Sequence, residues 1–173
     1  MFPKVFVLDV DGVMTTGHFI YSEDGKVLKI FGPDDNDGLS LLKENLKIIF
    51  VTGDKKGFKI SKKRIQDDMG YSISLVSTIH RVDWISKHFN LNDVIYMGDG
   101  IFDHYVMKKV GYSIAPANAD QIAKNNADYI TIRSGGNRAV AEACLHILEK
   151  FFEPYNELEL PKVKNLSGEW IVC

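Results

Sequence analysis

Short apolar runs that end in polar residues alternate along this chain with segments of helical spacing. The residues from Val5 to Val10 are apolar except for Asp9, a pattern typical of a strand buried on both faces of a parallel sheet. Further strands are predicted within KIIFVTGD, SISLV, DVIYMGDG, YSIAPANA and DYITI. Helices are predicted at Asp37–Leu46, Gly57–Met69, Arg81–Phe89, Phe102–Lys109 and Arg138–Phe152. This order predicts an α/β fold, a doubly wound parallel sheet flanked by helices.

One segment departs from this alternation. The stretch HFIYSEDGKVLKIF contains two β-like runs around Glu23-Asp24-Gly25, which predicts a β-hairpin at about residues 17–31. Only about two dozen residues separate the first polar strand end from the helix at Asp37, too few for an inserted domain. We therefore expect one domain over residues 1–152, followed by a proline-interrupted, extended tail over residues 153–173.

Composition narrows the classes of protein to consider. The 173 residues are 45% hydrophobic, which suits one substantial core, and the formal charge of −2 includes no long run of either sign. A nucleic-acid or membrane-surface protein held by bulk charge is therefore not expected. No leader pattern and no apolar stretch of about 20 residues is present, so we expect a cytoplasmic protein. Cys144 and Cys173 suggest neither a disulfide framework nor a zinc site.

Three of the predicted strands end in polar clusters. These are DVDG at residues 9–12, VTGD at residues 51–54 and MGDG at residues 97–100, with Asp103 three residues later. A lone Asp-x-Asp is more often a turn or a helix cap, but the carboxyl ends of parallel strands meet in one crevice. Asp9 and Asp11 point to the same side of a strand, where two like charges repel unless a cation or a proton lies between them.

These motifs resemble those of the haloacid dehalogenase superfamily of phosphotransferases. DVDGVMTTG resembles its first motif, VTGD its second and GDGIFD its fourth, and the likeness runs from Lys4 to Lys150. Within the superfamily, the chain is most similar to the capless phosphatases of the 3-deoxy-manno-octulosonate 8-phosphate phosphatase group, which act on phosphorylated octulosonic and nonulosonic sugar acids. The hairpin, LKIFGPDDNDGLSLL with Asp35 and Gly38, and SGGNRAVAEA carry this closer likeness.

The resemblance assigns chemistry to the acidic residues. It implies that Asp9 is the nucleophile that forms an aspartyl-phosphate, and that Asp11 protonates the leaving alkoxide and later deprotonates the attacking water. It also implies that Mg²⁺ is held by Asp9, the backbone carbonyl of Asp11 and Asp99, with Asp103 as a further ligand or directly behind the ligands. Hard oxygen ligands suit Mg²⁺.

The resemblance also implies a phosphate site in the second motif. The hydroxyl of Thr52 and the backbone N–H of Gly53 would bind phosphoryl oxygens. Asp54, in the same loop, is a further candidate for binding the substrate or its phosphate. Arg64 lies on a basic helix face with Lys59, Lys62 and Lys63. This face is usually only solvated, but Arg64 is a candidate for binding an anionic substrate.

The third motif of the superfamily usually supplies a lysine, which this chain lacks at the expected place. Arg81, at the start of the helix in STIHRVDWISK, is the candidate cation, whereas Lys87 should face away about two turns later. The alternative is that Arg81 is a solvated surface charge. Thr16, Asn36 and Gly100 also depart from the pattern of the subgroup, which leaves the substrate open.

The expected function is hydrolysis of a small phosphorylated sugar acid by a Mg²⁺-dependent phosphomonoesterase. The alternatives are a phosphatase for another sugar phosphate or a nucleotide, and a catalytically weak or inactive oligomerisation module. The predicted hairpin carries more apolar surface than a protruding hairpin can leave in water. As in the capless relatives, we expect a homotetramer with the hairpins at the interface and the tail over residues 153–173 reaching a neighbouring subunit.

Overall fold

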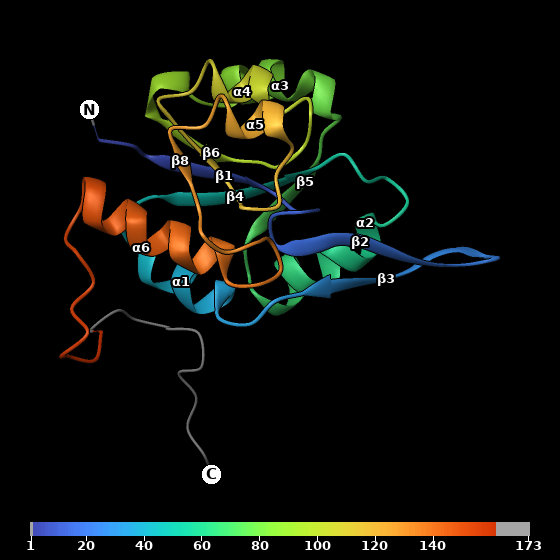
Figure 1. Ribbon diagram of the computed structural model, residues 1–173, viewed down its shortest axis with the longest axis horizontal. Helices are drawn as coiled ribbons and strands as arrows, with labels where there is room; N and C mark the ends of the chain where they lie inside the picture. Colours follow the sequence, from blue (N-terminus) through green and yellow to red (C-terminus); the bar gives the residue numbers. More distant parts are fainter. Residues whose placement is uncertain (1, 162–173) are drawn as a thin grey trace, which may run out of the picture.

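A computed structural model describes residues 2–161 and contains the predicted parallel sheet (Figure 1). Its six strands lie in the order β5-β4-β1-β6-β7-β8. They are β1 (Val5–Asp9), β4 (Lys47–Thr52), β5 (Ser72–Leu75), β6 (Val94–Met97), β7 (Tyr112–Ala115) and β8 (Tyr129–Ile130). The chain builds outward from β1 first to one side and then to the other, so a crevice opens beside the carboxyl end of β1.

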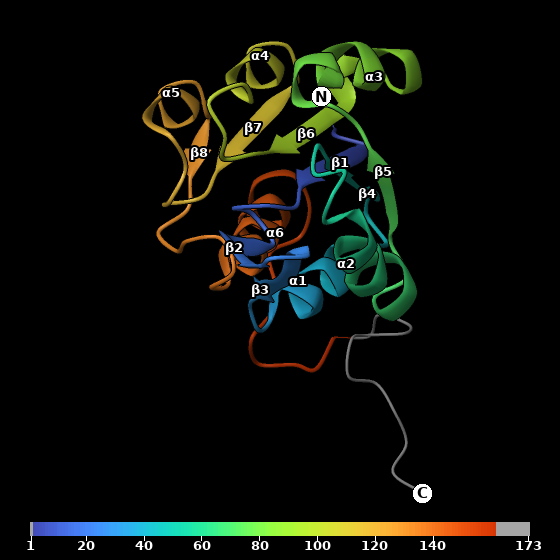
Figure 2. The same ribbon diagram turned by 90° about the vertical axis from the view of Figure 1, so that its right-hand side faces the viewer.

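Helices cover both faces of the sheet, which confirms the doubly wound architecture. Figure 2 shows α1 (Asp35–Leu42), α2 (Phe58–Lys62) and α6 (Ala139–Phe151) on one side of the sheet. On the other side lie α3 (Arg81–His88), α4 (His104–Met107) and α5 (Gln121–Lys124). Short 3₁₀ turns occupy Thr78–His80 and Leu91–Asp93. Within residues 2–161, no helix has the length and apolar character to cross a membrane.

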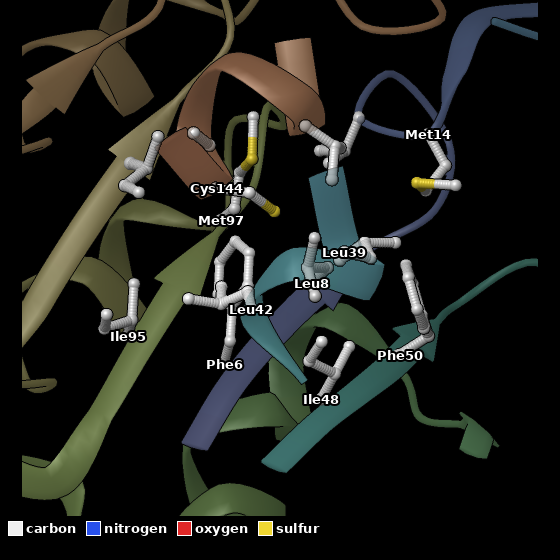
Figure 3. Packing of buried hydrophobic residues seen from close by; sticks show 14 of the residues in the cluster. Phe6, Leu8, Met14, Leu39, Leu42, Ile48, Phe50, Ile95, Met97 and Cys144 are labelled. Atoms are coloured by element: carbon white, nitrogen blue, oxygen red, sulfur yellow. The ribbon is translucent and has the colours of Figure 1, made fainter. Parts of the chain in front are cut away.

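The core consists of two apolar layers separated by the sheet. Side chains of β1 alternate between them, so Phe6 and Leu8 enter the layer under α1 and α6 while Val5 and Val7 enter the opposite layer. In Figure 3, Phe6 and Leu8 lie near Leu42 and Leu39 of α1, with Cys144 of α6 above them in this view. Every residue of β1 is buried, as its nearly continuous apolar sequence predicts.

The predicted hairpin is present and extends from the carboxyl edge of the sheet (Figure 1). It consists of β2 (Thr15–Ser22) and β3 (Gly25–Phe31), and no domain is inserted between β1 and α1. Ile20 pairs with Leu28 whereas Tyr21 pairs with Lys26, so Val27 is an extra residue in β3. This β-bulge changes which face of the strand the following side chains occupy.

Several predicted boundaries differ from the structure. The helix expected at residues 57–69 is α2 followed by a π-helical segment, η1 (Lys63–Asp68), and the helix expected at Phe102–Lys109 is the single turn α4. The one-turn helix α5 was not predicted. Residues 153–161 contain no helix or strand, while the remainder of the predicted tail, residues 162–173, lies outside the described residues.

Candidate active site

The site is built around the carboxyl end of β1. Asp9 is the last residue of this strand and is nearly fully buried, and its Oδ1 accepts a hydrogen bond from the backbone N–H of Val10 at 2.7 Å. Gly12 follows with a φ of +83°, and a Cβ there would lie 1.9 Å from Oδ2 of Asp99. A residue without a side chain is therefore needed for the first and fourth motifs to meet.

Three carboxylates converge at this point. Asp9, Asp99 and Asp103 each offer one oxygen, and these oxygens lie within 4.8 Å of one another. Asp103 is already occupied on both oxygens: Oδ2 accepts the N–H groups of Asp99 and Gly100 at 3.0 and 2.8 Å, and Oδ1 accepts from Arg81 and Tyr96. Asp103 therefore holds the loop that carries Asp99 and lies directly behind the other two carboxylates.

The electrostatics of this acidic cluster favour a bound cation. Burial, together with the charges of Asp9 and Asp103, raises the pKa of Asp99 to about 8. Burial also raises the pKa of Asp9 to about 6, although the neighbouring Arg81 acts in the opposite direction. A divalent cation would remove the repulsion between the carboxylates, and an all-oxygen donor set fits a hard ion such as Mg²⁺.

Arg81, the predicted cation, lies inside this cluster. It is the first residue of α3 and has no exposed surface. Its guanidinium donates to both oxygens of Asp9 at 2.9 and 3.1 Å and to Oδ1 of Asp103 at 2.8 Å. The alternative of a solvated surface charge is wrong for Arg81, whereas Lys87 is exposed in the last turn of α3.

Tyr96 is a site residue that the sequence did not reveal. It lies in β6 and is fully buried, and its hydroxyl donates to Oδ1 of Asp103 at 2.5 Å while accepting from Arg81 at 2.7 Å. Tyr96 thus links the two charged groups that flank the nucleophile position. The available signal was a hydroxyl-bearing aromatic in the apolar strand that precedes GDG.

The second motif lies beside the first. Thr52 ends β4 and is fully buried, and its hydroxyl lies 3.4 Å from Oδ2 of Asp11. The same hydroxyl accepts the backbone N–H of Asp54 at 3.1 Å. Gly53 is exposed between these two residues. The structure therefore brings Asp11, Thr52 and Gly53 to one end of the sheet.

Two lysines of the hairpin reach this end of the sheet. Nζ of Lys29 lies 2.9 Å from Oδ2 of Asp11, 2.9 Å from Oδ2 of Asp54 and 2.8 Å from Oγ of Ser61, and Nζ of Lys26 lies 2.5 Å from Oδ2 of Asp54. Sequence reasoning missed both lysines, because residues three apart in a regular strand point to opposite faces. Only the bulge at Val27 places them on the same face.

Among the described contacts, the remaining predicted binding residues, Asp54 and Arg64, have other partners than the acidic cluster. Although burial raises the pKa of Asp54, the hydrogen bonds from Lys26 and Lys29 lower it to about 2. Asp54 is therefore an ionised partner of the hairpin lysines, and a carboxylate in that state repels phosphate. Arg64 is half-buried and lines a groove between β3 and η1 with residues such as Phe31. Among the described contacts, none joins Arg64 to the acidic cluster.

The motif SGGNRAVAEA supports the first motif from behind. A Cβ on Gly135 would lie 1.9 Å from the carbonyl oxygen of Gly12, so the two backbones are in direct contact. Asn118 joins them by donating to that oxygen at 3.0 Å and accepting the N–H of Gly135 at 2.6 Å. These glycines therefore position the loop that carries Asp11.

Asp35 and Gly38 have a comparable supporting place. Oδ1 of Asp35 accepts the backbone N–H of Ala141 at 3.0 Å, in the first turn of α6. A Cβ on Gly38 would lie 2.7 Å from the Cα of Ala141, so the glycine allows α1 and α6 to pack closely. The residues that carried the closer likeness thus fix helices and loops around the site.

Sequence comparison agrees with this geometry. The haloacid dehalogenase-like hydrolase family matches residues 84–143. The 3-deoxy-D-manno-octulosonate 8-phosphate phosphatase KdsC of Salmonella typhi is 32% identical over 148 residues, covering 82% of this chain and 77% of that protein. Its counterpart from Escherichia coli K12 is 30% identical over 152 residues, with the same coverage.

Solved structures give the same result. The 3-deoxy-D-manno-octulosonate 8-phosphate phosphatase of Moraxella catarrhalis, in complex with a magnesium ion, a phosphate ion and a KDO molecule, has a TM-score of 0.72 at 28% identity. The alignment covers 85% of this chain and 86% of that one. The enzyme of Yersinia pestis has a TM-score of 0.75 at 29% identity, covering 85% and 81%. By sequence, fold and motif geometry, the chain belongs to the haloacid dehalogenase superfamily, among the relatives of 3-deoxy-D-manno-octulosonate 8-phosphate phosphatase.

Proposed function

We propose that this phosphatase is a Mg²⁺-dependent phosphomonoesterase for a small phosphorylated sugar acid. The substrate class is that of 3-deoxy-octulosonate 8-phosphate or a nonulosonate 9-phosphate. The observation that carries the proposal is the meeting of Asp9 and Asp11 with Thr52, Arg81 and Asp99 at one end of the sheet. The sugar acid follows from the relatives that are about 30% identical over most of the chain.

The metal would be held by the carboxylates of Asp9 and Asp99 and the backbone carbonyl of Asp11, with Asp103 behind them. When bound, Mg²⁺ supplies positive charge that lets a phosphate dianion approach the carboxylate of Asp9. Arg81 contributes a second, fixed positive charge, because its guanidinium already contacts both oxygens of Asp9.

The protein residues carry out the reaction in two displacements. The carboxylate of Asp9 attacks phosphorus, the ester P–O bond breaks, and the departing sugar oxygen takes a proton from Asp11. Asp11, now ionised, removes a proton from water, which attacks the aspartyl-phosphate. Inorganic phosphate leaves, and both aspartates return to their starting states. Thr52 donates its hydroxyl to a phosphoryl oxygen, and the exposed backbone N–H of Gly53 binds another.

The inactive oligomerisation module is the weaker alternative. A chain that had lost its activity would have no reason to keep Arg81 buried against Asp9 and Asp103, since buried ion pairs seldom add to stability. A phosphatase for another sugar phosphate uses the same residues, so only the substrate distinguishes it.

Phosphate release from a panel of esters tests the proposal. With Mg²⁺, kcat/KM for 3-deoxy-octulosonate 8-phosphate or a nonulosonate 9-phosphate should exceed that for neutral sugar phosphates such as glucose 6-phosphate by at least about tenfold. EDTA should abolish turnover, and Mg²⁺ should restore it. A higher kcat/KM for a neutral sugar phosphate would show that the proposed substrate class is wrong. Full activity in metal-free buffer would reject the metal site.

A substitution at the nucleophile tests the mechanism. Asp9→Asn should lower turnover by at least about a thousandfold, because an amide is nearly isosteric but does not attack phosphorus. Asp83→Asn, an exposed aspartate of α3, is the matched control and should keep the parent rate. If the turnover of Asp9→Asn stayed within tenfold of the parent rate, the assignment of Asp9 as the nucleophile would be wrong.

A further inference from the structure

Lys29 is a buried cation that the proposed reaction leaves without a role. Its side chain has no exposed surface, and an ammonium buried without partners destabilises a protein by several kcal/mol. All three of its donor positions are used, since Nζ lies within 2.9 Å of Asp11, Asp54 and Ser61. With all three donors in use, the ammonium of Lys29 holds the side chains of Asp11, Asp54 and Ser61 in a defined geometry around it.

Lys29 is the closest side-chain partner described for the Asp11 carboxylate. Nζ of Lys29 lies 2.9 Å from Oδ2 and 2.8 Å from Oδ1, so the ammonium faces both oxygens of the carboxylate. Within the described residues, the other side-chain contact of Asp11 is the long one of 3.4 Å with Thr52. Without Lys29, the Asp11 side chain could rotate away from the ester oxygen while its backbone stayed in place.

The hairpin is shaped to deliver this lysine. The bulge at Val27 places Lys26 and Lys29 on one face of β3, and Lys26 continues to Asp54. Gly57 leaves the space, because a Cβ there would lie 2.1 Å from Oδ2 of Asp54 and 2.8 Å from Cε of Lys29. The two lysines of the hairpin thus contact one aspartate in each of the two motif loops, Asp11 and Asp54.

We propose that Lys29 is a positioning residue that holds the Asp11 carboxylate where it exchanges a proton with the ester oxygen. The hairpin is then part of the active site of its own chain, in addition to any place it has in an assembly. This inference rests on the proposed phosphatase mechanism, in which Asp11 protonates the leaving group. Lys26 anchors the same hairpin without contacting Asp11, so it provides a matched control.

The test compares two esters that differ in their need for a proton. The phenol of p-nitrophenyl phosphate is acidic and leaves without protonation, whereas the alkoxide of 3-deoxy-octulosonate 8-phosphate requires a general acid. The value of kcat/KM reports the steps up to loss of the alcohol, so slow hydrolysis of the aspartyl-phosphate does not mask the difference. Lys29→Met should lower kcat/KM for the sugar ester at least about tenfold more than for the aryl ester.

Asp11→Asn should shift the ratio of the two esters in the same direction as Lys29→Met, and Lys26→Met should leave that ratio at the parent value. Equal losses on both esters in Lys29→Met would overturn the proposal, because a purely structural role does not depend on the leaving group. If Lys29→Met does not fold, Lys29→Gln takes its place in the same comparison.

Crystal structures provide a second readout that does not need turnover. In Lys29→Met, the Asp11 carboxylate should leave its place beside Thr52, and in Lys26→Met it should stay. An unmoved Asp11 in Lys29→Met overturns the positioning role even if the enzyme is active. Conversely, a parent protein that hydrolyses neither ester with Mg²⁺ overturns the proposed function, and the crystal structures still decide whether Lys29 positions Asp11.

Discussion

At the scale of single residues, Arg81 is the cation that pairs with two carboxylates of the acidic cluster. Its guanidinium faces Asp9 and Asp103, and the side chains of all three residues are at most 10% exposed. Removing one partner of a buried ion pair typically destabilises a protein by about 3–5 kcal/mol, because the remaining charges lose their compensation. The planar guanidinium contacts Asp9 through two nitrogens, an arrangement that the single ammonium of a lysine cannot make.

Arg81→Met should therefore lower both stability and activity. We expect the free energy of unfolding to fall by about 3 kcal/mol and kcat/KM by at least about a hundredfold, since Asp9 loses its fixed cation. Chemical denaturation and phosphate release measure the two effects. Lys87→Ala, on the exposed side of the same helix, is the control and should change neither. A larger loss of activity in Lys87→Ala than in Arg81→Met would instead make Lys87 the cation of the third motif.

The pKa of Asp99 predicts a pH dependence of stability in the metal-free protein. An unfolded aspartate ionises near pH 4, whereas folded Asp99 keeps its proton up to about pH 8. The folded state thus binds more protons in this range, so the free energy of unfolding falls as the pH rises towards 8. Between pH 6.5 and 8 the loss should be about 1–2 kcal/mol, measured by denaturation in EDTA.

Mg²⁺ should reverse this trend, because the ion replaces the proton between the carboxylates. Its addition should raise the melting temperature more at pH 8 than at pH 6.5. Asp99→Asn should remove both the pH dependence of stability without metal and the larger effect of Mg²⁺ at pH 8, since an amide does not titrate. Metal-free protein that is equally stable at the two pH values would show that Asp99 is ionised throughout.

The residues that end strands could be predicted from sequence, whereas those that reach the site from elsewhere could not. Asp9, Thr52 and Asp99 follow apolar runs, and parallel strands bring their carboxyl ends together. Tyr96 looked like an ordinary strand aromatic. Lys29 would be expected on the solvent-exposed face of the hairpin, because the sequence does not predict the bulge at Val27 that turns it inward.

At the scale of secondary structure elements, strands were predicted more accurately than helices. A buried strand such as β1 leaves a continuous apolar signature over its whole length. Two helices are shorter than their patterns suggest, since α4 comprises one turn and α2 continues as a π-helical segment, whereas the one-turn helix α5 has no clear pattern. The ends of these helices depend on tertiary packing, which the local periodicity of the sequence does not reveal.

The contact between the hairpin and α2 gives an element-scale prediction. Gly57, at the start of α2, has no room for a side chain beside Asp54 and Lys29. Gly57→Ala should therefore displace the lysines of β3 and lower kcat/KM by about tenfold or more, although alanine favours helix formation. Lys56→Ala, an exposed neighbour in the same loop, is the control. Parent activity in Gly57→Ala would show that the cluster around Asp54 tolerates displacement.

At the scale of the whole molecule, the hairpin leaves apolar surface uncovered. Phe19, Ile20, Tyr21, Val27, Leu28 and Ile30 are each between 42% and 57% exposed. Burial of apolar surface stabilises an interface by roughly 25 cal/mol per Å². We therefore expect the hairpins to join copies of the chain, in the homotetramer predicted from the resemblance, where neighbouring subunits would help to enclose the substrate.

Light scattering after size-exclusion chromatography tests the assembly. The parent protein should elute as a tetramer, and the double substitution Ile20→Lys with Leu28→Lys should shift it to smaller species, because charges do not fit an apolar interface. Ile132→Lys changes an even more exposed apolar residue outside the hairpin and should leave the mass unchanged. A fully active parent monomer at assay concentration would reject both the tetramer and the shared enclosure of substrate.

The central place of β1 also determines when a newly made chain can become an enzyme. The ribosome delivers Asp9 before the strands that pair with β1, which begin at Lys47 and Val94. The loop after it needs Gly135, which is delivered later still. A nascent chain or a prematurely ended one would therefore carry the nucleophile on an unpaired strand, prone to wrong pairing and unable to turn over substrate. Phosphatase activity should emerge only after the segment that contains Gly135 has been synthesised.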